Sequence, residues 1–399
     1  MKLRLWGASV AAACALGLAS SVAVQPASAT PSSGAGVTAF FTDSTTIGNG
    51  LPTVNRISGI DRTGNGNYVM IAEDVLPARF FTASIGYTSV TASFTGQPRI
   101  NGGGTVLGPW FLPLLPGQAQ FEGIRQSAGG YTVVSGGNNQ FVRQIGPIGQ
   151  VLRDLPLPSV WRPSSKSGLA GQRGLTGVAV GPQGQVSVLT AGGLRQDAAR
   201  SARLLTFGKT NREFVYRTDA NKVAADVLAI NSTDFLVLER GPGKLSNIFW
   251  TTTRGATSVT NKKKLSGREK AMTKRRIFST TATPHLLTGN MSGLAWGNWH
   301  PDNPFAKTRT RTLLVVSDNV GSPNRLHSFE VQIPKSIHRL RLAGAGSRFV
   351  HGGASLQEIV VPVLTINKKR RSDTRLVHIE VLPESDKITT GQLVVRLFQ

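Results

Sequence analysis

The chain has 399 residues, and its 45 Lys and Arg against 21 Asp and Glu give a formal net charge of +24 at pH 7. Its single cysteine, Cys14, excludes a disulfide framework. Glycine is frequent and the apolar runs are short and rich in Val, Ile, Phe and Thr, a composition that favours β structure over helical bundles.

The N-terminus has the pattern of a bacterial export signal. Basic residues precede an apolar stretch over residues 5–24, and Ala27-Ser28-Ala29 supplies the small residues that a signal peptidase accepts. The sequence therefore predicts a signal peptide over residues 1–29, cleavage after Ala29 and a secreted or extracytoplasmic mature chain without a thiol. An uncleaved anchor is the alternative, but Ala, Ser and Gly dilute the apolar stretch, and no later segment approaches a membrane span.

Residues 38–331 repeat one pattern: a short apolar strand, a turn with Gly, Asn or Asp, and another strand. A turn signal such as Gly64-Asn65-Gly66 precedes each strong strand. The strongest strands are Asn67–Ala72, Tyr131–Val134, Val186–Leu189, Phe235–Leu238 and Leu313–Val316. Such wide, repeated spacing predicts an all-β fold with a β-propeller-like domain, in which each small sheet buries its faces against its neighbours. A β-sandwich is the structural alternative.

Basic residues concentrate between residues 254 and 311 and in the run Lys368–Arg371. Neither cluster is interleaved with aromatic residues or forms a recognition helix. We therefore expect solvated loops with weak, salt-sensitive attraction to polyanions, and no specific nucleic-acid site.

The sequence texture changes near Ile333-Pro334-Lys335, which predicts a domain boundary. Residues 334–399 would form a short β-rich C-terminal fragment with strands over 359–366 and 377–381. So few residues rarely bury an independent core. The oligomeric state is left open by the sequence.

Seven short phrases follow one another in order within residues 38–331. They are Ser58-Gly59-Ile60-Asp61, Ala72-Glu73-Asp74 with Ala78-Arg79-Phe80-Phe81, Phe121-Glu122-Gly123-Ile124, Ala202-Arg203-Leu204, Leu236-Val237-Leu238-Glu239-Arg240, Gly293-Leu294-Ala295-Trp296-Gly297 and Ser317-Asp318-Asn319. Together they resemble the secreted phytase-like esterase family, which carries the esterase-like activity of phytase domain. The resemblance implies a propeller and a hydrolase of small-molecule esters or phosphoesters.

Three positions depart from the family pattern, because acids that family members carry are replaced. Thr176 and Ser292 stand where the family tends to have an acid, and Ser135-Gly136-Gly137 lacks the acid expected after the serine. Since such acids can bind a cation or act as a general base, two hypotheses stand side by side: a hydrolase, and a non-catalytic propeller that binds a ligand.

The remaining acids and two arginines are the candidate site residues. Catalytic roles are expected for Glu122, Asp61 and Asp74, substrate binding for Arg79 and Arg240, and metal binding for Asp226, Glu239 and Asp318. Inner strands of a propeller converge on a central channel, where carboxylates can gather to hold Ca²⁺ or polarise a water, and guanidinium groups can bind a phosphoester. The structural alternative is that these acids cap turns and form ion pairs between blades.

The C-terminal fragment carries a second resemblance. Residues 336–362, with the phrase His351-Gly352-Gly353-Ala354-Ser355-Leu356-Gln357-Glu358, resemble the end of the PglZ phosphatase domain of the alkaline phosphatase superfamily. That resemblance places a metal-ligand role on His351. No nucleophile and no further Asp or His ligands of such a domain precede it, so the segment is expected to be a fused fragment without a complete site.

Overall fold

The structure is a computed structural model. It describes residues 36–48, 54, 56–73, 77–115, 117–283, 289–303, 306–318, 324–335, 380–383 and 395–398. The predicted signal peptide, residues 1–29, and the predicted strand over 359–366 lie outside these residues. In the described ranges, no helix has the length and hydropathy of a membrane span.

Five four-stranded antiparallel sheets make up the described part of residues 36–335, and each is a blade. Blade 1 contains β2 (Ile57–Arg62), β3 (Asn67–Ala72), β4 (Arg79–Ser84) and β5 (Arg99–Thr105). Blade 2 contains β6 (Phe121–Ser127), β7 (Gly130–Ser135), β8 (Phe141–Ile145) and β9 (Val151–Leu155). Blade 3 contains β10 (Leu175–Val180), β11 (Val186–Thr190), β12 (Ser201–Thr206) and β13 (Arg212–Arg217).

The last two blades continue the pattern and close it. Blade 4 contains β14 (Val223–Ala229), β15 (Asp234–Arg240), β16 (Ser246–Thr252) and β17 (Thr273–Ser279). Blade 5 contains β18 (Asn290–Trp299), β19 (Thr308–Asp318), β20 (Asn324–Pro334) and, from the other end of the domain, β1 (Thr38–Ile47). β1 pairs antiparallel with β20, with Thr38 opposite Gln332 and Ile47 opposite Asn324. The first and last described strands of the domain therefore share one sheet.

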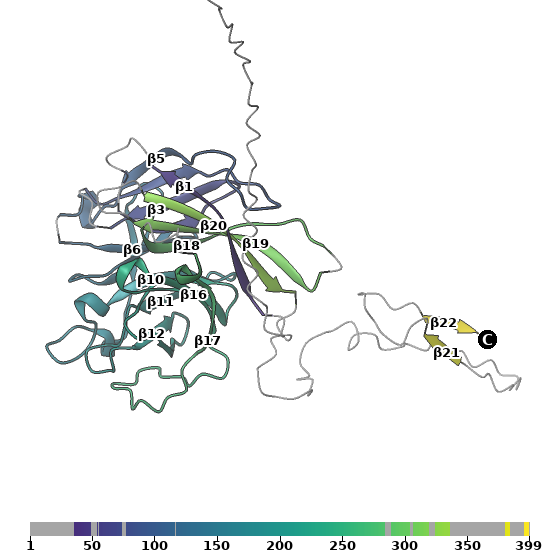
Figure 1. Ribbon diagram of the computed structural model, residues 1–399. Coiled ribbons are helices and arrows are strands. Elements are labelled where there is room, and N and C mark those ends of the chain that lie inside the picture. Colours follow the sequence, from purple (N-terminus) through teal and green to yellow (C-terminus); the bar gives the residue numbers. More distant parts are fainter. Residues whose placement is uncertain are drawn as a thin grey trace, which may run out of the picture. The chain divides into compact units, whose positions relative to one another are not determined.

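The blades form a closed ring. The first strand of each blade contacts the first strand of the next, through β2, β6, β10, β14 and β18, and β18 contacts β2 again. Figure 1 labels three of these strands, β6, β10 and β18, near the middle of the domain. One apolar cluster fills each space between neighbouring blades. Between blades 1 and 2, for example, the rings of Phe80 and Tyr131 lie 5.4 Å apart. The predicted propeller is therefore confirmed, with five blades, and the β-sandwich alternative is wrong.

The five strands that the sequence predicted most strongly are the second strands of the five blades, β3, β7, β11, β15 and β19. A second strand is paired on both sides and covered on both faces, so its residues form an almost continuous apolar run. All five residues of β11 are buried, and in β15 only Arg240 is not. The apolar runs in the sequence are therefore strongest in the strands that are buried on both faces.

The first strands share a local pattern in which a residue is bulged out just before a glycine. The pairing with the second strand slips before Gly59, Gly123, Gly177 and Gly293. A Cβ on Gly177 would lie 2.7 Å from the Val227 nitrogen of the next blade, so these strands approach closely because the position has no side chain. Blade 4 has the same slip, but Asp226 takes the place of the glycine.

The remaining described elements are short. They are the 3-10 helices η1 (Pro109–Phe111), η2 (Ser159–Trp161), η3 (Gly171–Arg173), η4 (Pro242–Lys244) and η5 (Thr280–Ala282), and the strand pair β21 (Glu380–Pro383) and β22 (Val395–Phe398). β21 overlaps the predicted strand over 377–381. β20 ends at Pro334, close to the predicted boundary.

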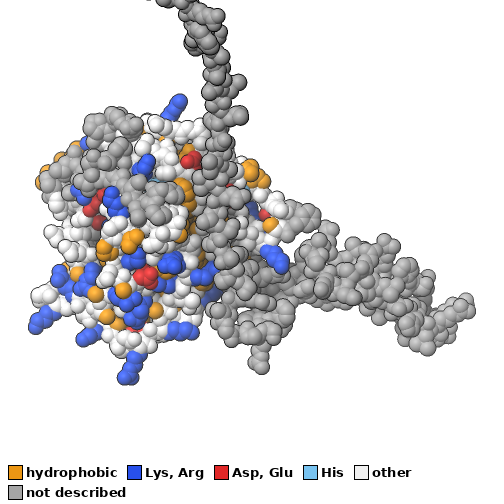
Figure 2. All heavy atoms as spheres, viewed as in Figure 1, with side chains coloured by type: hydrophobic (Ala, Val, Ile, Leu, Met, Phe, Trp, Pro, Cys, Tyr) orange, Lys and Arg blue, Asp and Glu red, His pale blue; other side chains and the backbone are white. Residues whose placement is uncertain are grey.

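Basic side chains are common on the face of the propeller drawn in Figure 2, with few acidic ones among them. The connection between β16 and β17 contributes six basic residues and one acid: Arg254, Lys262, Lys263, Lys264, Arg268, Lys270 and Glu269. Lys262 pairs with Glu269, whose oxygens also accept from the Ser266 and Gly267 nitrogens. Part of this charge therefore stabilises the loop itself. That the basic loops bind no specific nucleic acid remains a prediction.

Candidate functional site

The first strands of all five blades run in the same direction along the channel, so the channel has two distinct mouths. The starts of these strands share what we term the N-terminal mouth, where the Ser58 hydroxyl donates to the Phe121 carbonyl at 2.7 Å. Their ends share the C-terminal mouth, where the Gln126 nitrogen donates to the Asp61 carboxylate at 2.7 Å.

A buried ion pair lies between the two mouths. Arg125 of blade 2 donates to Asp226 of blade 4 at 2.7 Å, and neither side chain is more than 1% exposed. Arg125 also donates to the Ile60 carbonyl of blade 1 at 2.6 Å, and Asp226 accepts from the Leu294 nitrogen of blade 5 at 2.8 Å. Burial raises the pKa of Asp226 to about 6, although the Arg125 guanidinium acts to lower it. Two side chains thus join four blades across the channel.

Carboxyl groups from two blades meet at the N-terminal mouth. The Gln120 amide donates to Glu73 at 2.8 Å and to Glu122 at 3.1 Å. The other oxygen of Glu73 forms an ion pair with Arg56 at 3.3 Å. Glu122 is the bulged residue before Gly123, so the bulge sets its side chain at the rim of the channel.

The electrostatics of the mouth centre on Glu122. Burial first, and then the charge of Glu73, raise its pKa to about 8 against the opposing effects of Arg240, the Gln120 hydrogen bond and Arg56. At neutral pH this carboxyl therefore holds its proton. A half-buried carboxyl with a raised pKa of this kind is typical of general acids.

Asp318, at the end of β19, lies in the same electrostatic environment. Burial and the charge of Glu73 raise its pKa, and Arg56 and Arg240 act to lower it. The residue is 8% exposed, and its Oδ1 atom has no hydrogen-bond partner within the described residues. Beside the half-buried Glu122, the mouth therefore offers a buried carboxyl with an unused acceptor.

Arg56 has a backbone conformation that arginine rarely adopts. Its φ is 49°, in the left-handed region, and its carbonyl accepts from the Glu73 nitrogen at 2.8 Å. Such strain persists where the surrounding structure fixes it, and it concentrates at functional sites. The strained turn holds Arg56 beside the acids of this mouth.

The structure brings together three of the predicted site residues, Glu122, Arg240 and Asp318. Asp61 lies at the C-terminal mouth, where it accepts from the Gln126 nitrogen. Gln126 and Glu122 are four residues apart on the same extended strand, so roughly 13 Å separates them. Arg79 begins β4, and its Nε donates to the Pro77 carbonyl at 3.2 Å. Two further candidates, Asp74 and His351, lie outside the described residues.

The three predicted metal ligands lie in three separate environments. Glu239 accepts from the Tyr216 hydroxyl at 2.7 Å and from Lys274 at 2.5 Å, so it joins blades 3 and 4 as the structural alternative expected. Asp226 is bound to Arg125, and Asp318 lies at the N-terminal mouth. No three His, Cys, Asp or Glu side chains of the described residues are placed to hold a metal ion. A Ca²⁺ ion, for which the sequence named these residues, stays a prediction.

The residues at the three positions where the sequence analysis expected family acids include two with contacts of their own. Thr176 and Ser292 are the bulged residues of blades 3 and 5, and their hydroxyls donate to carbonyls of the next blade, those of Ala225 at 3.1 Å and Ile57 at 2.7 Å. Ser58 makes the equivalent bond from blade 1. Three of the five bulge positions thus join neighbouring blades through hydroxyl groups.

Sequence reasoning missed Arg56, Gln120, Glu73 and Arg125 as members of the channel. Glu73 is the neighbour of the candidate Asp74 in the same family phrase, so that phrase could have indicated Glu73 as a site residue. Arg125 follows Ile124 on the same strand, and only the fold shows that it reaches Asp226.

A family model described as phytase-like, esterase-like activity of phytase, matches residues 52–334. The chain belongs to this phytase-like esterase family. The matched range contains every strand of the five blades except β1. The N-terminal mouth of this phytase-like esterase domain gathers residues from four of the family phrases, which supply Glu73, Glu122, Arg240 and Asp318.

A second family model, the BREX system PglZ alkaline phosphatase-like domain, matches residues 304–366. The alkaline phosphatase-like protein PglZ of Bacillus cereus is 37% identical over 73 residues, which are 17% of this chain and 8% of that protein. The chain thus spans less than a tenth of that relative. The PglZ match begins before β19 and includes β20, so it overlaps strands that belong to blade 5 of the phytase-like esterase domain.

Two solved structures illustrate the remote likenesses. The PQQ-bound aldose sugar dehydrogenase of Streptomyces coelicolor has 11% identity and a TM-score of 0.38, with 74% of this chain and 99% of that chain covered. The core factor of S. cerevisiae has 9% identity and a TM-score of 0.25, with 75% and 61% covered. At these scores neither likeness bears on the function of the phytase-like esterase domain.

Proposed function

We propose that the phytase-like esterase domain hydrolyses a small carboxylic or phosphate ester at the N-terminal mouth, with Glu122 as the proton donor. The observation that carries this proposal is the raised pKa of Glu122, about 8, at a mouth that also holds Asp318, Arg56 and Arg240. Membership of the esterase family supports the reaction class.

In the proposed reaction the two carboxyls have opposite roles. Asp318 in its ionised form accepts a proton from a water molecule, whose oxygen forms the new bond to the carbonyl carbon or the phosphorus. The bond to the leaving oxygen breaks, its electron pair stays on that oxygen, and the proton of Glu122 neutralises it. The proton on Asp318 then returns to Glu122 through solvent, which restores the starting state.

The arginines of the mouth suit a substrate with negative charge. Arg56 and Arg240 act electrostatically on both Glu122 and Asp318, so an anionic group between them would also be close to the reacting bond. A guanidinium group binds carboxylate or phosphate oxygens with two parallel hydrogen bonds. The proposed reaction uses no metal ion in any step.

The test is hydrolysis by the purified full-length chain of phenyl and p-nitrophenyl acetates and phosphates, with and without Ca²⁺. Glu122→Gln keeps the shape of the side chain but has no proton to transfer, so kcat/KM should fall by about 100-fold or more. The loss should be larger for the phenyl substrates, because phenolate is the more basic leaving group and depends more on an acid.

Glu330→Gln, the same chemical change on β20, is the matched control and should leave turnover unchanged. Equal turnover by wild type and Glu122→Gln on all four substrates would contradict the assignment. Absence of any turnover by wild type would favour the second candidate, a propeller that binds a ligand without catalysis. Thr176 and Ser292 support that candidate, because their hydroxyls join blades at positions where the family resemblance implies acids.

A further inference from the structure

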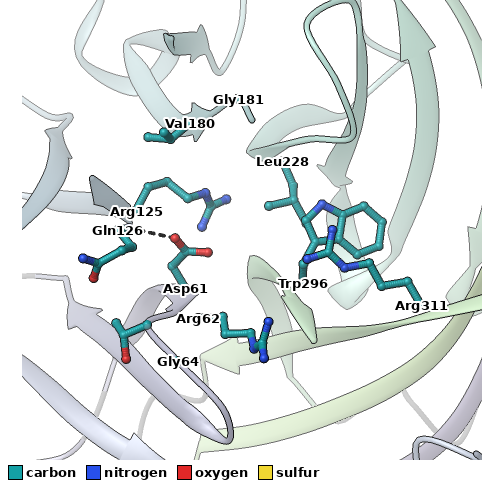
Figure 3. Close-up of a pocket in the computed structure, with 11 residues that line it drawn as sticks. Asp61, Arg62, Gly64, Arg125, Gln126, Val180, Gly181, Leu228, Trp296 and Arg311 are labelled. Carbon is teal, nitrogen blue, oxygen red and sulfur yellow. Dashed lines mark hydrogen bonds between the residues drawn. The ribbon is translucent and has the colours of Figure 1, made fainter. Parts of the chain in front are cut away.

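The C-terminal mouth of the channel contains a pocket of about 360 Å³ that the proposed function does not use. Residues from all five blades line it, and its charged members are Asp61, Arg62, Arg125 and Arg311. Figure 3 shows the guanidinium groups of Arg62, Arg125 and Arg311 around the same space as the Asp61 carboxylate. The buried ion pair of Arg125 with Asp226 separates this pocket from the N-terminal mouth.

Positive charge exceeds negative charge in this pocket. Arg125 is balanced by Asp226, which leaves Arg62 and Arg311 against the single carboxylate of Asp61. Burial first, and then the nearby charge of Arg62, lower the pKa of Arg311 to about 10, so the two cations are close enough to repel each other. An anion between them would relieve that repulsion.

Hydrogen-bond donors remain unused at the pocket. The Nε atoms of Arg62 and Arg125 are buried without a hydrogen-bond partner in the part of the chain that the structure describes, and Arg125 is 1% exposed. A buried donor without a partner costs free energy, so two of the arginines that line the pocket keep unused hydrogen-bonding capacity.

Packing holds the other arginine in place. Arg311 donates to the Gly297 carbonyl at 3.1 Å, and its guanidinium carbon lies 4.8 Å from the Trp296 ring centre and 5.1 Å from that of Trp299. A guanidinium that is fixed by aromatic faces loses little conformational freedom when an anion binds. The pocket is therefore preorganised on this side.

We propose that this pocket is a second binding site, which takes a small organic oxyanion, a carboxylate or phosphate monoester with a compact apolar part. The oxyanion would accept from Arg62 and Arg311, and the apolar part would pack against Val180 and Leu228, which also line the pocket. The volume is at the lower end of the range for small-molecule sites, which limits the ligand to about the size of one substituted ring.

The test is isothermal titration calorimetry of the full-length chain with benzoate and phenylphosphonate, which has no ester bond to hydrolyse, and with benzyl alcohol as the neutral comparison. Both anions should bind and benzyl alcohol should not. Arg62→Gln should weaken binding by about 10-fold or more, since it removes a charged donor whose described side-chain bond is to Asn65 on the surface. Arg153→Gln, at an exposed arginine of β9, is the matched control and should bind as wild type does.

A second variant separates the two mouths. Arg240→Gln should leave the binding of both probes at the C-terminal mouth unchanged and should weaken only anion binding at the N-terminal mouth, to which Arg240 belongs. If Arg240→Gln abolished binding while Arg62→Gln did not, the anion site would be at the other mouth and the proposal would be wrong. It would also be wrong if neither anion bound. Ester turnover should survive Arg62→Gln, so failure of this proposal and failure of the proposed hydrolase are distinguishable.

Discussion

The raised pKa of Glu122 makes a prediction that needs no knowledge of the substrate. Burial raises the pKa from 4.5 to about 8, so the folded protein holds this proton more tightly than the unfolded chain does. The contribution of Glu122 to stability is therefore complete below about pH 4.5 and decreases as the pH rises toward 8. With about 1.4 kcal/mol for each pKa unit, the whole decrease is roughly 5 kcal/mol.

Glu122→Gln removes this titration and keeps a carbonyl that can accept from Gln120. The free energy of unfolding of the variant, relative to wild type, should therefore increase by roughly 5 kcal/mol between about pH 4 and pH 9. Urea unfolding followed by tryptophan fluorescence at five or six pH values measures it, with Glu330→Gln as the control. A difference between Glu122→Gln and wild type that stays constant over this range would refute the raised pKa, and with it the role of Glu122 as an acid.

Three further predictions concern the ring itself, and urea unfolding measures each. Gly177→Ala should cost about 2 kcal/mol or more, since its Cβ would meet backbone atoms of the next blade, while Gly96→Ala, whose Cβ would have open space, should change stability by less than about 0.5 kcal/mol. Asp226→Ala should cost about 3–5 kcal/mol because it leaves Arg125 buried and unpaired, and adding Arg125→Met should recover most of that loss. Thr176→Val should cost about 1 kcal/mol for one hydrogen bond between blades, and no loss would mean that this bond contributes nothing.

The sequence predicted the fold class because the second strands are buried on both faces and produce uniform apolar runs. It did not predict the partner of β1, whose residues are nearly all half-buried and show no such run. β1 pairs with β20, hundreds of residues later in the chain, and the pairing depends on backbone hydrogen bonds that have no side-chain signature. Closure of the ring was therefore visible only in three dimensions.

The candidate site was predicted in part, because the family phrases name acids without placing them along the channel. Asp61 follows Gly59 by two positions, and Glu122 precedes Gly123 by one. The glycines of neighbouring first strands lie beside each other, so the two acids lie on opposite sides of them along the channel. A strand rises about 3.3 Å per residue, and this difference in position directs Asp61 and Glu122 to opposite mouths. An alignment of the inner strands on their glycines would have separated them.

Asp226 shows why the rest could not be predicted. It occupies the place of an inner-strand glycine, and its partner, Arg125, comes from a blade that is not its neighbour in the ring. Side chains that meet only at the channel axis can be any distance apart in the sequence. Their spacing therefore does not indicate that they pair. The predicted metal role of Asp226 rested on its type alone, whereas the contacts of this carboxylate are to a guanidinium and two backbone nitrogens.

The shared sheet of blade 5 sets an order of events during synthesis. β1 leaves the ribosome early, but its pairing partner is complete only at Pro334. At about 5–20 residues per second, β1 waits roughly 15–60 s for β20, with its edge unpaired in the meantime. Residues 304–334, which the PglZ match also covers, are therefore the last piece that the propeller needs before it can close. A ribosome that stalls before this point would expose an incomplete ring with two open blade faces.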